Sequence, residues 1–126
     1  MTIPEEIEMA VSYFNENYNT KISVAQYAES LHISTNWFIR NFKQHMKMSP
    51  AQYLLSLRMV NAQSLLENTD YSVGEIAEIV GYDNQLYFSR VFKKEYGISP
   101  AQYRKRAENQ SAAPMESDVG EITRED

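Results

Sequence analysis

The pentapeptide Ser-Pro-Ala-Gln-Tyr occurs twice in this chain of 126 residues, at Ser49–Tyr53 and at Ser99–Tyr103. The similarity extends upstream of both copies. When residues 23–53 are aligned with residues 72–103, with one residue inserted after Asp83, 13 of the 31 paired positions are identical. So many matches in the same order indicate a duplicated structural unit. This duplication decides the fold of most of the chain.

Composition excludes several kinds of site. The chain has no cysteine, which excludes disulfides, thiolate zinc sites and cysteine nucleophiles. Glu5, Glu6 and Glu8 stand where a signal peptide needs basic residues. The most apolar stretch, residues 53–60, contains Arg58 and is too short to span a bilayer. We therefore expect a cytoplasmic protein without a membrane segment.

Charge is distributed unevenly along the chain, whose formal net charge is −5. Residues 108–126 hold six acids and one base, and residues 1–20 hold four acids and no base. The remaining residues, 21–107, therefore carry a net charge of +4. A local basic region of this kind suits a partner rich in phosphate, although the whole chain is acidic.

Four serines stand three residues before a Gln or Glu, a pattern typical of helix starts. The pairs are Ser23 and Gln26, Ser49 and Gln52, Ser72 and Glu75, and Ser99 and Gln102. In such a capping box, each side chain satisfies a backbone N–H group that the first helical turn leaves free. Pro50 and Pro100 suit the first helical position, which needs no N–H donor. We predict helices that begin near residues 24, 50, 73 and 100.

Three further helices are predicted by apolar spacing and capping residues. They span residues 2–18 with Thr2 as the cap, 35–47 after Ser34, and 85–96 after Asp83 or Asn84. The last of these is closed by Gly97. No stretch alternates as a strand would, so the sequence predicts an all-α fold of seven helices.

Each repeat reads as a short helix, a turn and a second helix, which is the helix-turn-helix arrangement. Gly81 ends the leading helix of the second repeat and can adopt a positive φ, whereas His32 stands there in the first repeat. The predicted division of the chain is residues 1–53 and 69–107 for two helix-turn-helix subdomains, residues 50–68 for a long linker helix, and residues 108–126 for an acidic, disordered tail.

The second helix of each repeat has two faces. Phe38 and Phe42, like Phe88 and Phe92, are four residues apart and belong on a buried stripe. The other side carries short polar, amide and cationic groups. Such a mixture suits the major groove of DNA, where amides pair with adenine, Arg pairs with guanine, and Lys neutralises phosphate.

These features resemble the DNA-binding region of the AraC/XylS family of bacterial transcription regulators. The resemblance covers about residues 5–106 and is most specific in Ile-Ala-Glu-Ile-Val-Gly-Tyr at residues 76–82 and in Tyr-Phe-Ser-Arg-Val-Phe-Lys-Lys-Glu-Tyr-Gly-Ile-Ser-Pro at residues 87–100. The first repeat is looser and departs from the pattern at His32 and Met48. The family implies a homeodomain-like tandem fold, with recognition helices at about residues 35–47 and 85–96 in successive major-groove segments about 34 Å apart.

Site residues follow from the resemblance by position. The candidates for base contacts are Thr35, Asn36, Ile39 and Arg40 in the first repeat and Gln85, Leu86, Ser89 and Arg90 in the second. The candidates for phosphate contacts are Lys43, Lys47, Lys93 and Lys94. Because the two base-contact sets differ in chemistry, we expect one chain to bind two different half-sites. The resemblance also implies RNA polymerase and a sensor or receiver domain, absent from this chain, as further partners. The chain could be an excised carboxy-terminal domain or one of the family's stand-alone short regulators.

Other readings remain open from the sequence alone. The chain could be an interaction module that has lost DNA affinity and binds a partner protein through its acidic ends. Enzymatic DNA-alkylation repair, found fused to such domains, needs an acceptor cysteine that this chain lacks. His32 and His45 have no evident carboxylate or metal-ligand partner. We therefore expect no enzyme activity, cofactor or metal. The pentapeptides read as capping and packing devices, with phosphate binding at the helix starts near Ser49 and Ser99 as the alternative.

Overall fold

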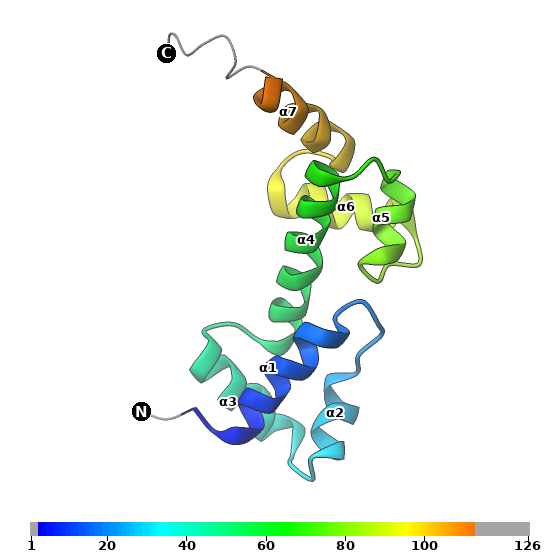
Figure 1. The fold of residues 1–126 in the computed structure, drawn as a ribbon. Coiled ribbons are helices and arrows are strands. Elements are labelled where there is room, and N and C mark those ends of the chain that lie inside the picture. The colour runs from blue at the N-terminus through cyan, green and yellow to red at the C-terminus, as the bar shows by residue number, and fades with distance from the viewer. Residues whose placement is uncertain (1–2, 113–126) are drawn as a thin grey trace, which may run out of the picture.

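The duplication appears in the computed structural model as two three-helix units at opposite ends of one long helix (Figure 1). The structure describes residues 3–112. Its helices are α1 (Glu5–Asn17), α2 (Val24–Ser30), α3 (Thr35–Met46), α4 (Pro50–Asn68), α5 (Val73–Ile79), α6 (Gln85–Tyr96) and α7 (Pro100–Ala112). No strand occurs among these residues, so the predicted all-α fold of seven helices is confirmed.

The helix starts follow the capping residues. The side chains of Ser23, Ser34, Ser49, Ser72, Asn84 and Ser99 each accept a hydrogen bond from the backbone N–H three residues further on. The reciprocal bond of a capping box forms at Ser49, Ser72 and Ser99. Within the described residues, the Gln26 side chain accepts no hydrogen bond from the backbone N–H of Ser23, so this capping box is incomplete. All four predicted starts are confirmed.

Two helix boundaries differ from the sequence-based expectation. Helix α1 begins at Glu5, because Pro4 takes the capping position without a side-chain bond; the predicted start at residue 2 is therefore wrong, and Thr2 lies outside the described residues. Helix α7 continues to Ala112, into the segment predicted to be disordered. Residues 101–112 contain no Gly or Pro and many good helix formers, so nothing ends the helix at 107. The rest of that prediction, residues 113–126, lies outside the described residues.

Each unit has its own hydrophobic core. The first contains Ile7, Ala10, Phe14, Ala28, Phe38, Phe42 and Leu54, and the second contains Met59, Ala62, Leu66, Ile76, Ala77, Val80, Tyr82, Phe88 and Phe92. Helix α4 is shared, since it gives Leu54 to the first core and Met59 to the second. Five residues rotate a helix by about 140° beyond a full turn, so α4 buries different sides at its two ends. This explains why its sequence shows no single apolar stripe.

The two pentapeptides serve capping and packing, as predicted. Tyr53 packs edge-on against Phe42 with ring centroids 5.6 Å apart, and Tyr103 packs in the same way against Phe92 at 5.5 Å. The proline of each copy is buried. These contacts hold the start of α4 and the start of α7 against the second helix of the preceding helix-turn-helix.

Candidate nucleic-acid interface

The exposed face of α3 carries the first set of predicted residues. Phe38 and Phe42 are fully buried, which fixes the rotation of the helix. On the other side, Asn36, Arg40 and Lys43 are exposed to solvent. Ile39 is 38% exposed and adds an apolar side chain to this face. The remaining candidates are Thr35, which is half-buried, and Lys47, which is exposed.

Helix α6 repeats this arrangement in the second unit. Phe88 and Phe92 are fully buried, and Leu86 is 62% exposed. The polar and cationic candidates Gln85, Arg90, Lys93 and Lys94 are all exposed, while Ser89 is half-buried. The structure thus places the predicted side chains of both units at the surface or at its edge.

The carboxyl-terminal ends of α3 and α6 meet at one groove. This groove has a volume of about 420 Å³ and lies between the end of one helix, at Lys47 and Met48, and the end of the other, at Glu95 and Tyr96. Its floor comes from α4, through side chains that include Gln52, Leu55 and Ser56. The ends of both helices therefore lie beside the same stretch of α4, and Lys47 is the one predicted residue that lines this groove.

The ends of these helices share an unusual backbone conformation. Helix α3 is capped at its carboxyl-terminal end by Lys47 with φ 66°, and helix α6 is capped by Gly97 with φ 84°. The turns before the helices also have positive φ, at His32 with 61° and at Gly81 with 102°. The positive φ expected at Gly81 is confirmed, and the first unit achieves the same turn without a glycine.

Two exposed side chains on these helices were missed by the sequence reasoning. Gln44 is exposed and stands four residues after Arg40, so its spacing placed it on the same row. Tyr87 is 57% exposed and stands beside Leu86 in the first turn of α6. In the alignment of the two repeats, Tyr87 corresponds to Trp37, which is half-buried, so nothing in the sequence indicated that Tyr87 is exposed.

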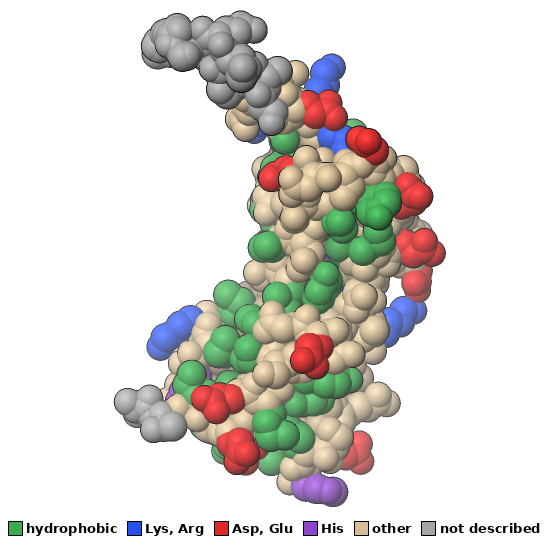
Figure 2. Space-filling model, viewed as in Figure 1, with side chains coloured by type: hydrophobic (Ala, Val, Ile, Leu, Met, Phe, Trp, Pro, Cys, Tyr) green, Lys and Arg blue, Asp and Glu red, His purple; other side chains and the backbone are tan. Residues whose placement is uncertain are grey.

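Helices α1 and α3 differ in charge. Helix α3 contains no acid and carries Lys43 and His45 in its last turn. Helix α1, in contrast, has Glu5, Glu6 and Glu8 in its first turn. Figure 2 shows a face on which apolar and acidic side chains predominate, with the visible Lys and Arg side chains near the outline of the molecule.

Metal and membrane sites are not evident in residues 3–112. These residues contain no group of three or more His, Cys, Asp or Glu side chains that could hold a metal ion. His32 lies exposed in a turn and His45 lies half-buried on α3. Within the same range, no helix combines the length and the apolar character needed to cross a bilayer.

Comparison with known proteins agrees with this geometry. A family model described as a helix-turn-helix domain matches residues 27–106. The raffinose operon transcriptional regulatory protein RafR of Pediococcus pentosaceus is 38% identical over 101 residues, which are 80% of this chain and 36% of that protein. The chain spans little more than a third of the length of the curated relatives it matches.

Solved structures show the same arrangement of helices. The carboxy-terminal domain of AraT, a response regulator from Geobacillus stearothermophilus, has a TM-score of 0.80 and 31% identity, over 100% of this chain and 97% of that domain. The DNA-binding domain of AdpA, a global transcriptional factor solved with a target DNA, has a TM-score of 0.77 and 30% identity, over 88% and 98% of the two chains. RafR and AdpA are both named for the regulation of transcription. The chain belongs to the AraC/XylS family of DNA-binding transcription regulators.

Proposed function

We propose that this chain binds a specific sequence of double-stranded DNA, with α3 and α6 as recognition helices in successive major-groove segments. One observation carries the proposal. Two equivalent helices expose amide, cationic and apolar side chains opposite a buried Phe pair, and both end at one groove beside α4. A single basic helix face is common on protein surfaces, but a matched pair whose ends lie beside a shared helix suits a duplex.

The exposed and half-buried candidates on α3 and α6 supply the chemistry of base recognition. Asn36 and Gln85 can each form two hydrogen bonds with an adenine, and Arg40 and Arg90 can each do so with a guanine. Ile39 and Leu86 can contact the methyl group of thymine, and Thr35 and Ser89 can bond to several base edges. Lys43, Lys47, Lys93 and Lys94 are then left for the phosphates, which position the protein without reading sequence.

The two helices differ at three of the four paired base-contact positions. Only Arg40 and Arg90 match, whereas Thr35 pairs with Gln85, Asn36 with Leu86, and Ile39 with Ser89. A palindromic operator requires two identical readers, as in a symmetric dimer. We therefore propose that one chain binds two unlike half-sites.

The length of α4 is compatible with this mode of binding. Its 19 residues give a helix about 28 Å long. Major-groove segments on one face of a duplex lie about 34 Å apart. A connecting helix of this length supports, without fixing it, a spacing of α3 and α6 that suits successive major-groove segments.

The cellular role follows from the family. A relative such as RafR regulates an operon, and AdpA is a global transcriptional factor. We propose that this chain likewise controls transcription in a bacterial cytoplasm, with RNA polymerase as a partner. The chain spans little more than a third of the length of these relatives. We therefore also propose a sensor or receiver domain as a further partner.

Titration with labelled duplexes at several salt concentrations tests the proposal. Binding to a selected duplex should exceed binding to a scrambled duplex by about a thousandfold or more. The logarithm of affinity should also fall linearly with the logarithm of salt concentration, because Lys and Arg displace counterions from phosphates. If no duplex is enriched by selection, or none binds in the titration, the alternative of a protein-interaction module is favoured.

A further inference from the structure

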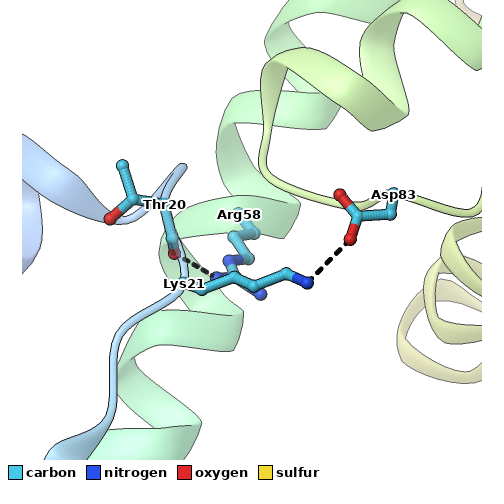
Figure 3. A network of polar contacts seen from close by, with 4 residues as sticks. All are labelled: Thr20, Lys21, Arg58 and Asp83. Atoms are coloured by element: carbon cyan, nitrogen blue, oxygen red, sulfur yellow. Dashed lines mark hydrogen bonds and ion pairs between the residues drawn. The ribbon is translucent and has the colours of Figure 1, made fainter.

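The loop between α1 and α2, residues 18–23, leaves the first unit and reaches the second. Arg58, near the middle of α4, donates hydrogen bonds from Nε to the Tyr18 carbonyl and from Nη2 to the Thr20 carbonyl, each at 2.8 Å. Figure 3 shows this loop beside α4, with Asp83 of the second unit facing it. The Tyr18 side chain packs against both hydrophobic cores.

Arg58 also contacts the second unit directly. Its guanidinium carbon lies 5.2 Å from the centre of the Tyr82 ring. Tyr82 is only 9% exposed and belongs to the second core. A guanidinium group is planar and carries its donors in a fixed fork, so it can bond to two carbonyls while it stacks on a ring. One side chain of α4 thus connects a loop of the first unit with an aromatic ring of the second.

Backbone contact between the units explains a difference between the two repeats. A Cβ atom at Gly81 would lie 3.1 Å from three backbone atoms of Asn19, closer than side chains normally approach a backbone. The φ of 102° at Gly81 also lies outside the left-handed region open to other residues, whereas the 61° at His32 lies inside it. The first repeat accepts histidine because its turn is exposed, while the second needs glycine because its turn meets the loop.

An ion pair closes the same junction. Lys21 Nζ lies 2.8 Å from Asp83 Oδ2, and both side chains are largely exposed. The hydrogen bond between the two side chains, together with the attraction of their charges, raises the pKa of Lys21 and lowers the pKa of Asp83. Exposed pairs add little to stability, but this pair joins the loop of one unit to the turn of the other.

Helix α4 is the main packed link between the two units. The principal helix contacts in the described chain lie within one unit or involve α4. Helix α4 sets the distance between the units and, through the sides it buries in the two cores, their rotation about its axis. The contacts at the junction form a second link, which opposes bending and twisting of α4. The junction therefore restrains the relative orientation of α3 and α6.

We propose that residues 18–21, Arg58 and residues 81–83 form an inter-unit clamp, and that Arg58 is a positioning residue that sets the half-site spacing the chain accepts. The inference rests on the proposed function. Adding or removing one base pair between half-sites moves one of them by about 3.4 Å and rotates it by about 35°. A clamped protein resists that change, whereas a protein with a loose junction adapts to it.

Distance measurements on the free protein test the clamp without DNA. Because the chain has no cysteine, Gln44→Cys and Lys94→Cys introduce two unique sites for spin labels on exposed positions of α3 and α6. Pulsed dipolar spectroscopy should give a narrow distance distribution in the parent protein. Arg58→Ala should broaden it, and Lys105→Ala, an exposed lysine on α7, should leave it unchanged. An equally narrow distribution with Arg58→Ala would overturn the clamp.

Charge reversal provides a variant with little risk of misfolding. Lys21→Asp removes the ion pair at an exposed site, and adding Asp83→Lys restores it with the charges exchanged. The single variant should broaden the label distances and the double variant should narrow them again. If the distance distribution stays broad in the double variant, the ion pair is not part of the clamp.

Binding to duplexes of different spacing tests the consequence for specificity. The parent protein should prefer one spacing over duplexes that are one base pair longer or shorter. Arg58→Ala should reduce that preference by about tenfold, the effect of losing about 1.4 kcal/mol of discrimination. An equal loss of affinity at all spacings would overturn the positioning role. If the parent protein binds no duplex, the proposed function fails. The distances between spin labels on the free protein then still test the clamp.

Discussion

Arg40 and Arg90 are the only candidate base-contact pair that is identical in the two units. An arginine can contact either a base or a phosphate, and its substitution distinguishes the two. Both are exposed on the face opposite a buried Phe pair. If Arg90 reads a guanine, Arg90→Ala should cost about 1–3 kcal/mol of binding free energy on the preferred duplex and relax preference at a single base pair. Affinities for duplexes substituted at each position provide the measurement.

Lys93→Ala is the matched control for this prediction. Lys93 is exposed one turn away on α6 and is a candidate for a phosphate contact. Its removal should weaken binding to all duplexes alike. It should also reduce the slope of log affinity against log salt concentration by about 1, because one phosphate contact is lost. If Arg90→Ala behaves in the same way, Arg90 is a phosphate contact and the base assignment is wrong.

Tyr103 gives a residue-scale prediction about stability. Its hydroxyl donates a hydrogen bond to the Glu67 carboxylate, and burial, together with that carboxylate, raises its pKa from 10.0 to about 12. The folded state then holds a proton that the unfolded state releases between these values. The stabilisation is full below pH 10 and is lost as the pH rises through the folded pKa.

The difference between the wild type and Tyr103→Phe isolates this group. Thermal unfolding between pH 10 and pH 12 should show a steeper loss of stability in the wild type than in the variant. Other tyrosines with raised pKa values, such as Tyr82 and Tyr96, are present in both proteins and cancel in the comparison. Parallel curves over this range would show that Tyr103 does not titrate in this way.

At the scale of elements, the first turn of α5 lies against the first residue of α6. A Cβ atom at Gly74 would come within 2.7 Å of the Gln85 side-chain oxygen, and the next nearest atoms are 3.5 Å away or more. The carboxamide is the end of a flexible side chain, so it can move aside. Gly74→Ala should therefore redirect Gln85 and stabilise α5 by up to about 1 kcal/mol.

A double-mutant cycle checks this coupling between helices. Gly74→Ala alone should change the base preference at one position of the second half-site. The same substitution should change no preference in a Gln85→Ala background, because the side chain it displaces is gone. An altered preference in both backgrounds would place the effect elsewhere in α5 or α6.

The sequence predicted local elements well because their causes are local. Each capping serine acts on an N–H group three residues away, so helices beginning at residues 24, 50, 73 and 100 could be read directly. The start of α1 was missed because Thr2 satisfies the sequence pattern while Pro4 occupies the capping position. The end of α7 was missed because a change in composition was taken as the end of a helix that no residue breaks.

At the scale of the whole molecule, the relation between the two units could not be predicted from the sequence. The bonds from Arg58 to Tyr18 and Thr20 join residues about forty positions apart, and neither carbonyl acceptor leaves a trace in side-chain patterns. The duplication predicted two units and a linker helix. It did not reveal that α4 turns different sides to the two cores, or that both candidate recognition helices end at one groove.

Selection of duplexes from a random pool tests the central claim most directly. Intact chains are incubated with the pool at physiological salt, bound duplexes are amplified, and the enriched sequences are aligned. We predict one site with two unlike half-sites whose centres are about 10 base pairs apart, bound by one chain. A palindromic site bound by two chains, or no enriched sequence at all, would contradict recognition by α3 and α6 of the same molecule.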